Sequence, residues 1–250
     1  MKTVEYGKGN AKVIVLLHGG GLSWWNYEET AKILAESYHV VLPILDGHAG
    51  SDAPFTTIED NAKRVIAYIS ENYGGHVHLL GGLSLGGQIA TEVLSQRSHI
   101  CDFAVIESAL ACPMPVTAAL VKPAFSLCYP LIKMRWFSRL QCWSLGIRMS
   151  LFEAYYRDTS CIEKADLIAF MTANAVYRLR NTLAQCCAKT LVLVGGRERR
   201  IMKRSAHMIS ECLPSARLEV LKDLQHGELS INHGHRFAQM LLEWMQASDG

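Results

Sequence analysis

The stretch HLLGGLSLGGQIA, from His78 to Ala90, decides the fold of this 250-residue chain. A short apolar run leads into Gly82-Leu83-Ser84-Leu85-Gly86, and an amphipathic segment of helical period follows. A serine between two glycines at this point predicts a sharp turn from strand to helix, because glycine lets the backbone pack tightly around a strained residue. Such a turn lifts the serine hydroxyl clear of the sheet edge, beside the free N–H groups of a helix start. The alternative is an ordinary N-cap serine.

Short apolar runs alternate with helical patterns on both sides of this turn. Strands are expected at 12–20, 39–45, 77–83, 103–106, 190–196 and 217–221, and helices at 27–37, 58–72, 86–96, 202–212 and 235–246. This alternation is typical of a mostly parallel central sheet with helices on both faces. The predicted fold class is therefore α/β.

The alternation stops between residues 112 and 188. This segment contains aromatic residues, methionines and helix formers without clear strand runs, and helices are expected at 144–156 and 162–178. We therefore predict an α/β core from residues 1–111 and 189–250, with an inserted helical cap or lid at 112–188. Prolines and Lys122 interrupt the most apolar run, 109–132, so a helix spanning a membrane is not expected there.

Composition excludes several classes of function. The net charge is +2, from 25 basic and 23 acidic residues, which is too balanced for general nucleic-acid binding. The eight cysteines lack metal-ligand spacing and are expected to be buried free thiols, and no HExxH arrangement of histidines indicates metal catalysis. The polar amino terminus, MKTVEYGKGN, lacks the apolar core of a secretory signal, so we expect a cytoplasmic protein.

Three motifs, in this order, resemble those of the α/β-hydrolase superfamily, and the resemblance covers nearly the whole chain. LLHGGGLSWW (Leu16–Trp25) is similar to the family's oxyanion loop, LDGHAGSD (Leu45–Asp52) to its D-G-H-G-x-S loop, and GLSLGG (Gly82–Gly87) to its nucleophile elbow. Ala49 replaces a glycine that is usual in the second motif. The resemblance implies the α/β-hydrolase fold and a serine nucleophile, which excludes the aspartate nucleophile of related enzymes.

A serine hydroxyl is a poor nucleophile at neutral pH and needs a base, which in turn needs a third group to orient it. In the family these follow the serine in the order acid, then histidine. His226, in LKDLQHGELS, lies between the strand at 217–221 and the last helix and matches the family's histidine. His233 and His235 fall at the predicted helix start. The resemblance puts Glu198, in Gly195-Gly196-Arg197-Glu198, at the position of the acid.

The identity of the acid stays open at this point. Glu198 has three arginine neighbours, a pattern also typical of a surface ion-pair cluster: Arg197, Arg199 and Arg200. Asp223 is closer to His226 in sequence, although three residues before the histidine we expect it to face away. More remote carboxylates flank the strand at 103–106: Asp102 precedes it and Glu107 follows it.

The resemblance also implies two backbone N–H donors that hold an oxyanion, from Leu85 and from the glycine loop, where Gly20 is the expected donor. A plain flexible loop is the alternative for those glycines. Gly21, Trp24 and Trp25 are expected near the acyl pocket, although aromatic residues at a helix entrance equally often only pack. His18, in the same loop, is expected to make structural hydrogen bonds.

The predicted cap has a basic and aromatic stretch between residues 122 and 148. It contains no acidic residue, and its members are Lys122, Lys133, Arg135, Arg139, Arg148, Phe125, Tyr129, Trp136, Phe137 and Trp143. Contact with anionic membrane lipid or an acidic substrate is one interpretation. Basic stems lying along an apolar helix surface give the same pattern, and the sequence favours this second interpretation. Either way, an apolar cap indicates a small-molecule substrate with an apolar acyl or alcohol group.

These observations together predict a carboxylesterase-like serine hydrolase that works through an acyl-enzyme and needs no cofactor. Thioesters, lipid esters and carbon–carbon bonds would be cleaved by the same residues, so a thioesterase, a lipase or a C–C hydrolase is the alternative. A ligand-binding protein that kept the hydrolase fold is the alternative from another class.

Overall fold

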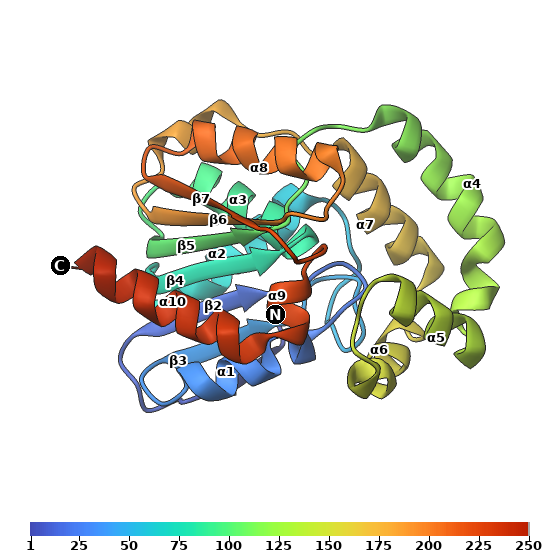
Figure 1. The fold of residues 1–250 in the computed structure, drawn as a ribbon, viewed down its shortest axis with the longest axis horizontal. Coiled ribbons are helices and arrows are strands. Elements are labelled where there is room, and N and C mark those ends of the chain that lie inside the picture. The colour runs from blue at the N-terminus through green and yellow to red at the C-terminus, as the bar shows by residue number, and fades with distance from the viewer. Residues whose placement is uncertain (250) are drawn as a thin grey trace.

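The computed structural model describes residues 1–249, and its centre is a seven-stranded sheet (Figure 1). The strands lie in the order β1-β3-β2-β4-β5-β6-β7. Their bounds are β1 (Thr3–Tyr6), β2 (Val13–Leu17), β3 (His39–Pro43), β4 (Val77–Leu83), β5 (Cys101–Glu107), β6 (Lys189–Gly195) and β7 (Ala216–Leu221). β2 to β7 pair in parallel, and β1 pairs antiparallel with β3 at the sheet edge. The predicted fold class is confirmed, and β1 is a strand that the sequence did not predict.

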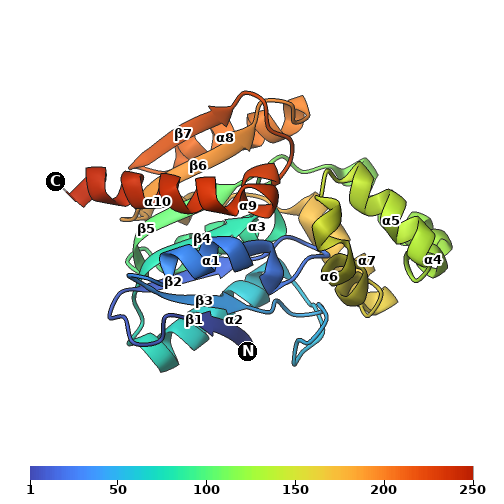
Figure 2. The same cartoon turned by 60° about the horizontal axis from the view of Figure 1, so that its bottom comes forward.

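Helices cover both faces of this sheet (Figures 1 and 2). The first face is covered by α1 (Glu28–Leu34) and α10 (Gly234–Asp249), and the second by α2 (Ile58–Tyr73), α3 (Leu85–Gln96) and α8 (Arg200–Cys212). Strand β2 explains how one sheet supplies two cores, because successive side chains of a strand point to opposite faces. Ile14 and Leu16 pack with α1 and α10, whereas Val15 and Leu17 pack with α2 and α3.

The chain between β5 and β6 forms helices and no strand within the described residues. They are α4 (Pro115–Ile132), α5 (Arg135–Ser144), α6 (Phe152–Thr159) and α7 (Lys164–Val176), with 3-10 turns at Met149–Leu151 and Asn181–Gln185. Similar short elements lie in the core: the 3-10 turn Trp24–Tyr27 and the helix α9 (Glu228–Asn232). Figures 1 and 2 place α4 and α5 at the end of the molecule beyond the strands. We call residues 115–185 the helical segment.

The helix expected at 144–156 is only partly present, because residues 152–156 belong to α6 and residues 145–148 are not helical. Gly146 adopts φ +70°, and the N–H of Ile147 bonds back to the carbonyl of Cys142 at 3.1 Å. This is a Schellman-type end, in which glycine takes the left-handed conformation that terminates a helix. α5 therefore ends at Ser144, and a new helix starts at Phe152.

α4 was not predicted, because its prolines were expected to interrupt the run. The helix nevertheless continues through Pro123 and Pro130. Both prolines are exposed, so the carbonyls that lose a donor lie on the solvent side of the helix, where interruption costs least. By length and composition α4 is the one helix within residues 1–249 that could cross a membrane, and only 11% of it is buried.

Candidate active site

Loops that follow five neighbouring parallel strands build the site. Each of β2, β4, β5, β6 and β7 ends at the same edge of the sheet, because parallel strands share a direction. The residues that follow them are His18 to Gly21, Ser84, Ser108, Glu198 and His226. Ser84 and His226, which are 142 positions apart in the sequence, therefore meet at one edge.

Ser84 sits on a strained turn between β4 and α3. Its φ is 53° and ψ is −111°, a conformation that costs a non-glycine residue about 1–3 kcal/mol. A Cβ at Gly82 would come within 2.3 Å of the Gly86 backbone, and a Cβ at Gly86 within 2.1 Å of the Leu17 carbonyl oxygen. Glycine is therefore required at both positions, because a side chain would collide with the neighbouring backbone. The Ser84 side chain makes no capping bond to α3, which argues against the ordinary N-cap interpretation.

The Ser84 hydroxyl belongs to a row of three hydrogen-bonded side chains. Its Oγ lies 3.0 Å from Nε2 of His226, and Nδ1 of His226 lies 2.7 Å from Oε2 of Glu198. An ionised carboxylate can only accept a hydrogen bond, so Nδ1 carries the proton and Nε2 is left to accept from the serine. His226 is 45% exposed, whereas the Glu198 side chain is only 1% exposed.

Three donors hold the carboxylate of Glu198. Besides His226, the Ser108 hydroxyl donates to Oε1 at 2.7 Å and the N–H of Gly195 donates to the same oxygen at 2.8 Å. Burial alone raises the pKa of Glu198, but the hydrogen bonds from His226, Ser108 and Gly195 outweigh it and leave the pKa below its ordinary value. Glu198 is therefore a buried anion beside the imidazole.

Ser108 is a site residue that sequence reasoning missed. It follows β5 directly, has φ 52°, and its hydroxyl also accepts from the N–H of Gly227, next to His226, at 3.4 Å. One hydroxyl thus joins the carboxylate to the loop that carries the histidine. Its position in the sequence could have identified it, because a polar residue at the carboxyl end of a central parallel strand lies at the same edge of the sheet as Ser84.

The other carboxylates lie elsewhere. Asp223 is 90% exposed and faces Arg197 at 3.7 Å, and Asp102 pairs with two histidines at the opposite end of β5. Glu107 is buried near the site, but its hydrogen-bond partner is the N–H of Ser230 at 3.4 Å, and its Oε2 has no partner within the described residues. Burial raises the pKa of Glu107 to about 7, only partly offset by Ser230.

Two buried histidines shape the loop after β2. His18 donates from Nδ1 to the Gly19 carbonyl and accepts from the N–H of Leu45, whereas His48 accepts from the N–H of Gly21 at 3.0 Å. Burial lowers the pKa of His18 to about 3 and that of His48 to about 4, so both rings are neutral at pH 7. They position the loop and have no free nitrogen for a proton transfer.

Gly20 lies against Leu85, the residue that follows Ser84. A Cβ on Gly20 would lie 3.5 Å from the Leu85 Cβ, so the two residues are in contact. Neither N–H donates to a protein acceptor within residues 1–249. The neighbouring N–H of Gly21 is already taken by His48. The N–H groups of Gly20 and Leu85 are therefore the candidate donors for an oxyanion.

A cavity of about 130 Å³ opens beside Ser84 and His226. Apart from these two, its lining consists of Gly19, Gly20, Leu22, Leu83, Leu145, Ile147 and Ile231. Gly21, Trp24 and Trp25 are not part of this wall. Trp25 is instead buried in the core, where its indole N–H donates to Asp158 at 2.9 Å. Sequence reasoning missed Leu145 and Ile147, because nothing in the sequence links the end of α5 to the serine.

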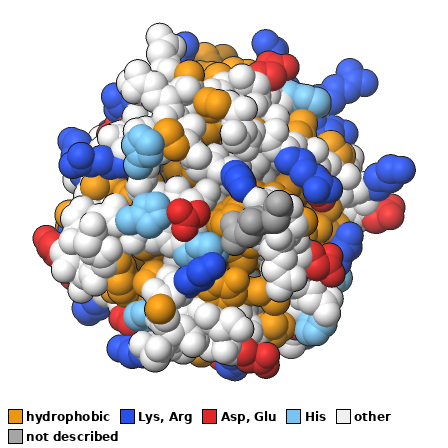
Figure 3. Space-filling view, turned by 90° about the vertical axis from the view of Figure 1, so that its left-hand side faces the viewer, with side chains coloured by type: hydrophobic (Ala, Val, Ile, Leu, Met, Phe, Trp, Pro, Cys, Tyr) orange, Lys and Arg blue, Asp and Glu red, His pale blue; other side chains and the backbone are white. Residues whose placement is uncertain are grey.

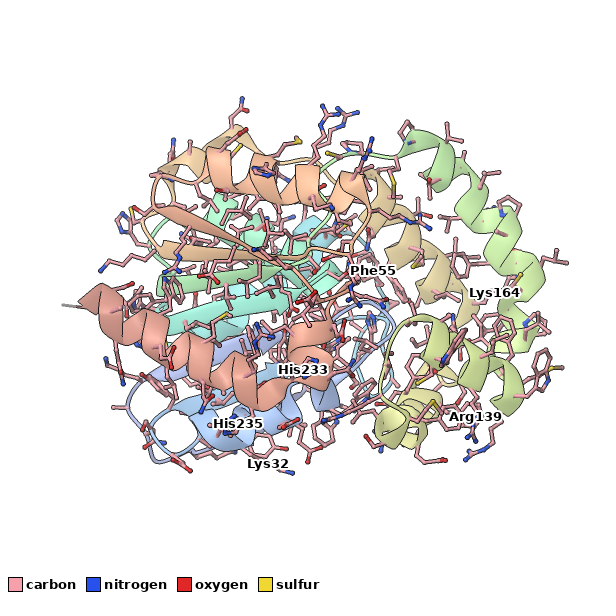
Figure 4. The ribbon with its side chains drawn as sticks, in the orientation of Figure 1. Lys32, Phe55, Arg139, Lys164, His233 and His235 are labelled. Carbon is pink, nitrogen blue, oxygen red and sulfur yellow. The ribbon has the colours of Figure 1, made fainter. Side chains whose placement is uncertain are left out.

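The other histidines considered in the sequence, His233 and His235, do not join the row at Ser84. His233 ends α9 and faces Glu228 at 3.6 Å, and His235 is exposed in the first turn of α10 (Figure 4). Neither is hydrogen-bonded to Ser84. Among residues 1–249, no three His, Cys, Asp or Glu side chains gather in a group that could hold a metal ion.

Known proteins resemble this chain in sequence and in fold. A Gibberella zeae protein described as an AB hydrolase superfamily protein is 34% identical over 115 residues, which is 45% of this chain and 40% of that protein. The match thus spans less than half the length of this relative. A thermophilic esterase from Thermogutta terrifontis has a similar structure, with a TM-score of 0.80 at 18% identity, covering 98% of this chain and 93% of that chain. The enol-lactonase from Burkholderia xenovorans LB400 has a TM-score of 0.80 at 16% identity, covering 98% and 96%.

At these identities the structural likeness concerns the fold. The sequence match to a family is broader, because the model of the Alpha/beta hydrolase family matches residues 14–240. That range includes the glycine loop, Ser84, Glu198 and His226. The chain therefore belongs to the alpha/beta hydrolase family.

Proposed function

We propose that the protein is a serine hydrolase that cleaves carboxylic esters with a small apolar acyl group. The observation that carries this proposal is the row of Ser84, His226 and Glu198, with contacts of 3.0 and 2.7 Å. The row has the direction that acyl transfer requires, from the hydroxyl to the neutral imidazole nitrogen and on to a buried carboxylate.

The reaction begins when Ser84 Oγ attacks the ester carbonyl and its proton passes to Nε2 of His226. Glu198 keeps the Nδ1 proton in place and stabilises the imidazolium that forms. The N–H groups of Gly20 and Leu85 donate to the developing oxyanion. His226 then protonates the leaving alcohol, and an acyl group stays on Ser84.

Water completes the cycle. His226 is 45% exposed, so a water molecule can reach Nε2, lose its proton there and attack the acyl carbonyl. The tetrahedral intermediate collapses, His226 returns the proton to Ser84 Oγ, and the acid product leaves. Every step uses side chains and backbone groups of this chain.

The cavity supports a small acyl group. The volume of about 130 Å³ is well below the roughly 300–1,000 Å³ of sites that take drug-sized ligands. Five apolar side chains line it: Leu22, Leu83, Leu145, Ile147 and Ile231. An acetyl to butanoyl group fits this space and polarity.

Labelling with a fluorophosphonate probe tests the nucleophile. We expect the wild-type protein to be labelled and Ser84→Ala to stay unlabelled, with Ser51→Ala, a serine on an outer loop, as the control that keeps labelling. A folded wild-type protein without labelling would favour the ligand-binding alternative. A series of p-nitrophenyl esters with a matched thioester then separates an esterase from a thioesterase.

A further inference from the structure

Exposed apolar residues form a row on each of two contacting helices of the helical segment, α4 and α5. Val116, Leu120 and Leu127 of α4 are 74%, 59% and 80% exposed. Trp136, Leu140 and Trp143 of α5 are 62%, 54% and 72% exposed. We call these six residues the α4–α5 face. Soluble monomers rarely leave so many large apolar side chains together in water.

The spacing of these residues makes each row a stripe. Positions 116, 120 and 127 differ by 4 and 7, and positions 136, 140 and 143 differ by 4 and 3, so each set lies along one side of its helix. Figures 1 and 2 place both helices at the outer end of the molecule. Figure 3 views the opposite end, where basic, acidic and apolar side chains are interspersed.

The helices α4 and α5 themselves carry basic residues and no acidic one. The chain has five basic residues and no acidic one between Glu107 and Glu153. Arg135 pairs with Glu153, whereas Lys133 and Arg139 have no acidic partner within the described residues. Figure 4 labels Arg139 near α5 and α6, at the end of the molecule away from the sheet.

The basic stems cover other rings. Lys133 lies over Tyr129, and Arg139 lies over Phe152. This packing agrees with the interpretation that the sequence favoured, in which basic stems lie along an apolar helix surface. It does not account for Trp136 and Trp143, which remain exposed.

We propose that the α4–α5 face docks on the surface of an anionic lipid bilayer. Its apolar stripes enter the boundary between headgroups and acyl chains, and Lys133 and Arg139 meet the anionic headgroups, as on amphipathic helices that lie in a membrane surface. A second copy of this chain is a poorer occupant. A two-fold interface would bring the same cations against each other with no carboxylate from 108–152 to neutralise them.

The helix α4 lies on the membrane and does not cross it. Its amino end is held to the neighbouring helix by the hydrogen bond from Met114 N–H to the Ala175 carbonyl, and Lys122 lies in its middle. Leu145, half-exposed and two residues after Trp143, also lines the cavity beside Ser84. Docking would therefore bring the mouth of that cavity close to the lipid surface.

Vesicle co-sedimentation of the full-length chain tests the proposal without reference to catalysis. We expect binding to vesicles of phosphatidylcholine with phosphatidylglycerol, weak binding to phosphatidylcholine alone, and a loss of binding as salt rises. Trp136→Glu with Leu140→Glu should lower the partition coefficient at least tenfold. Val220→Glu changes an exposed apolar residue of β7 outside the face and should leave binding unchanged.

Charge and fluorescence give independent readings. Lys133→Glu with Arg139→Glu should lower binding by about tenfold or more while thermal unfolding stays near wild type. Tryptophan emission should shift to shorter wavelength with anionic vesicles, and Trp136→Phe with Trp143→Phe should remove the shift. Absence of binding to anionic vesicles, or binding unaffected by the face variants, would overturn the proposal. A dimer in sedimentation equilibrium that the same variants abolish would assign the face to a second copy instead.

Discussion

Replacing Glu198 by glutamine should disable the site through the proton on His226. Oε1 of Glu198 accepts two hydrogen bonds, from Ser108 and from the N–H of Gly195. In the variant these two donors select the amide oxygen for that position. The NH₂ group is then forced into the place of Oε2, facing Nδ1 of His226 at a distance of about 2.7 Å.

An NH₂ group there can only donate, so Nδ1 must accept and the proton moves to Nε2. Nε2 then presents an N–H to Ser84 and cannot take the serine proton. Loss of the correct tautomer costs on the order of 10⁴ in kcat in a serine triad, which corresponds to about 5 kcal/mol of transition-state stabilisation. We expect a loss of this size with KM changed little.

Hydrolysis of p-nitrophenyl butyrate at pH 8, with thermal unfolding measured beside it, is the assay. Asp223→Asn is the matched control, because this carboxylate is 90% exposed and should keep wild-type turnover. Glu107→Gln should stay within tenfold of wild type. If folded Glu198→Gln kept turnover within tenfold while Glu107→Gln lost it, our assignment of the acid would be wrong.

Three further predictions concern the turn, the cavity and the buried carboxyl group. Gly86→Ala puts a Cβ 2.1 Å from the Leu17 carbonyl oxygen and should abolish labelling and lower the melting temperature, whereas Gly9→Ala, with nothing within 4 Å, should do neither in the same scan. The wild type should hydrolyse acetyl and butanoyl esters with a higher kcat/KM than octanoyl esters. Ile147→Ala should shift the ratio of kcat/KM for the butanoyl and octanoyl esters roughly tenfold toward the octanoyl ester. An unchanged ratio would place the acyl group elsewhere. Burial raises the pKa of Glu107 from 4.5 to about 7, so between these values the native state binds more protons than the unfolded state, and stability should fall as pH rises through 7. The melting temperature plotted against pH from 5 to 8 should therefore be flatter for Glu107→Gln than for the wild type. Parallel plots would contradict this prediction.

The sequence predicted the sheet well because its strands are buried on both faces. Val13–Leu17, Val77–Leu83 and Lys189–Gly195 read as apolar runs between turn residues, and such runs leave few alternatives. β1 was missed, since four half-buried residues at an edge carry no comparable signal. The order of the strands, β1-β3-β2-β4-β5-β6-β7, was not predicted, because pairing between distant segments leaves no local pattern.

The helical segment was harder to predict for a physical reason. Its apolar side chains at positions such as 116, 127 and 143 are exposed, so hydrophobic periodicity did not mark which face was buried. Pro123 and Pro130 suggested an interruption that the exposed position of α4 tolerates. The end of α5 depended on Gly146, whose capping role only the backbone angles reveal.

Within the site, the residues with sequence motifs were easier to place than those without them. Ser84 and His226 could be expected together because each lies in a recognisable loop, and Glu198 followed from its place after a strand. Ser108 and the cavity wall had no motif. Their positions depend on how separate segments meet, which local patterns do not encode.

The cavity divides its construction between two parts of the chain. The groups that would move protons come from loops at strand ends, while Leu145 and Ile147 come from the helical segment. Part of the cavity wall is consequently encoded in a stretch of the gene that is separate from the codons for the reactive groups. Replacing the segment between β5 and β6 by a different one would change this part of the acyl cavity and leave Ser84, Glu198 and His226 in place.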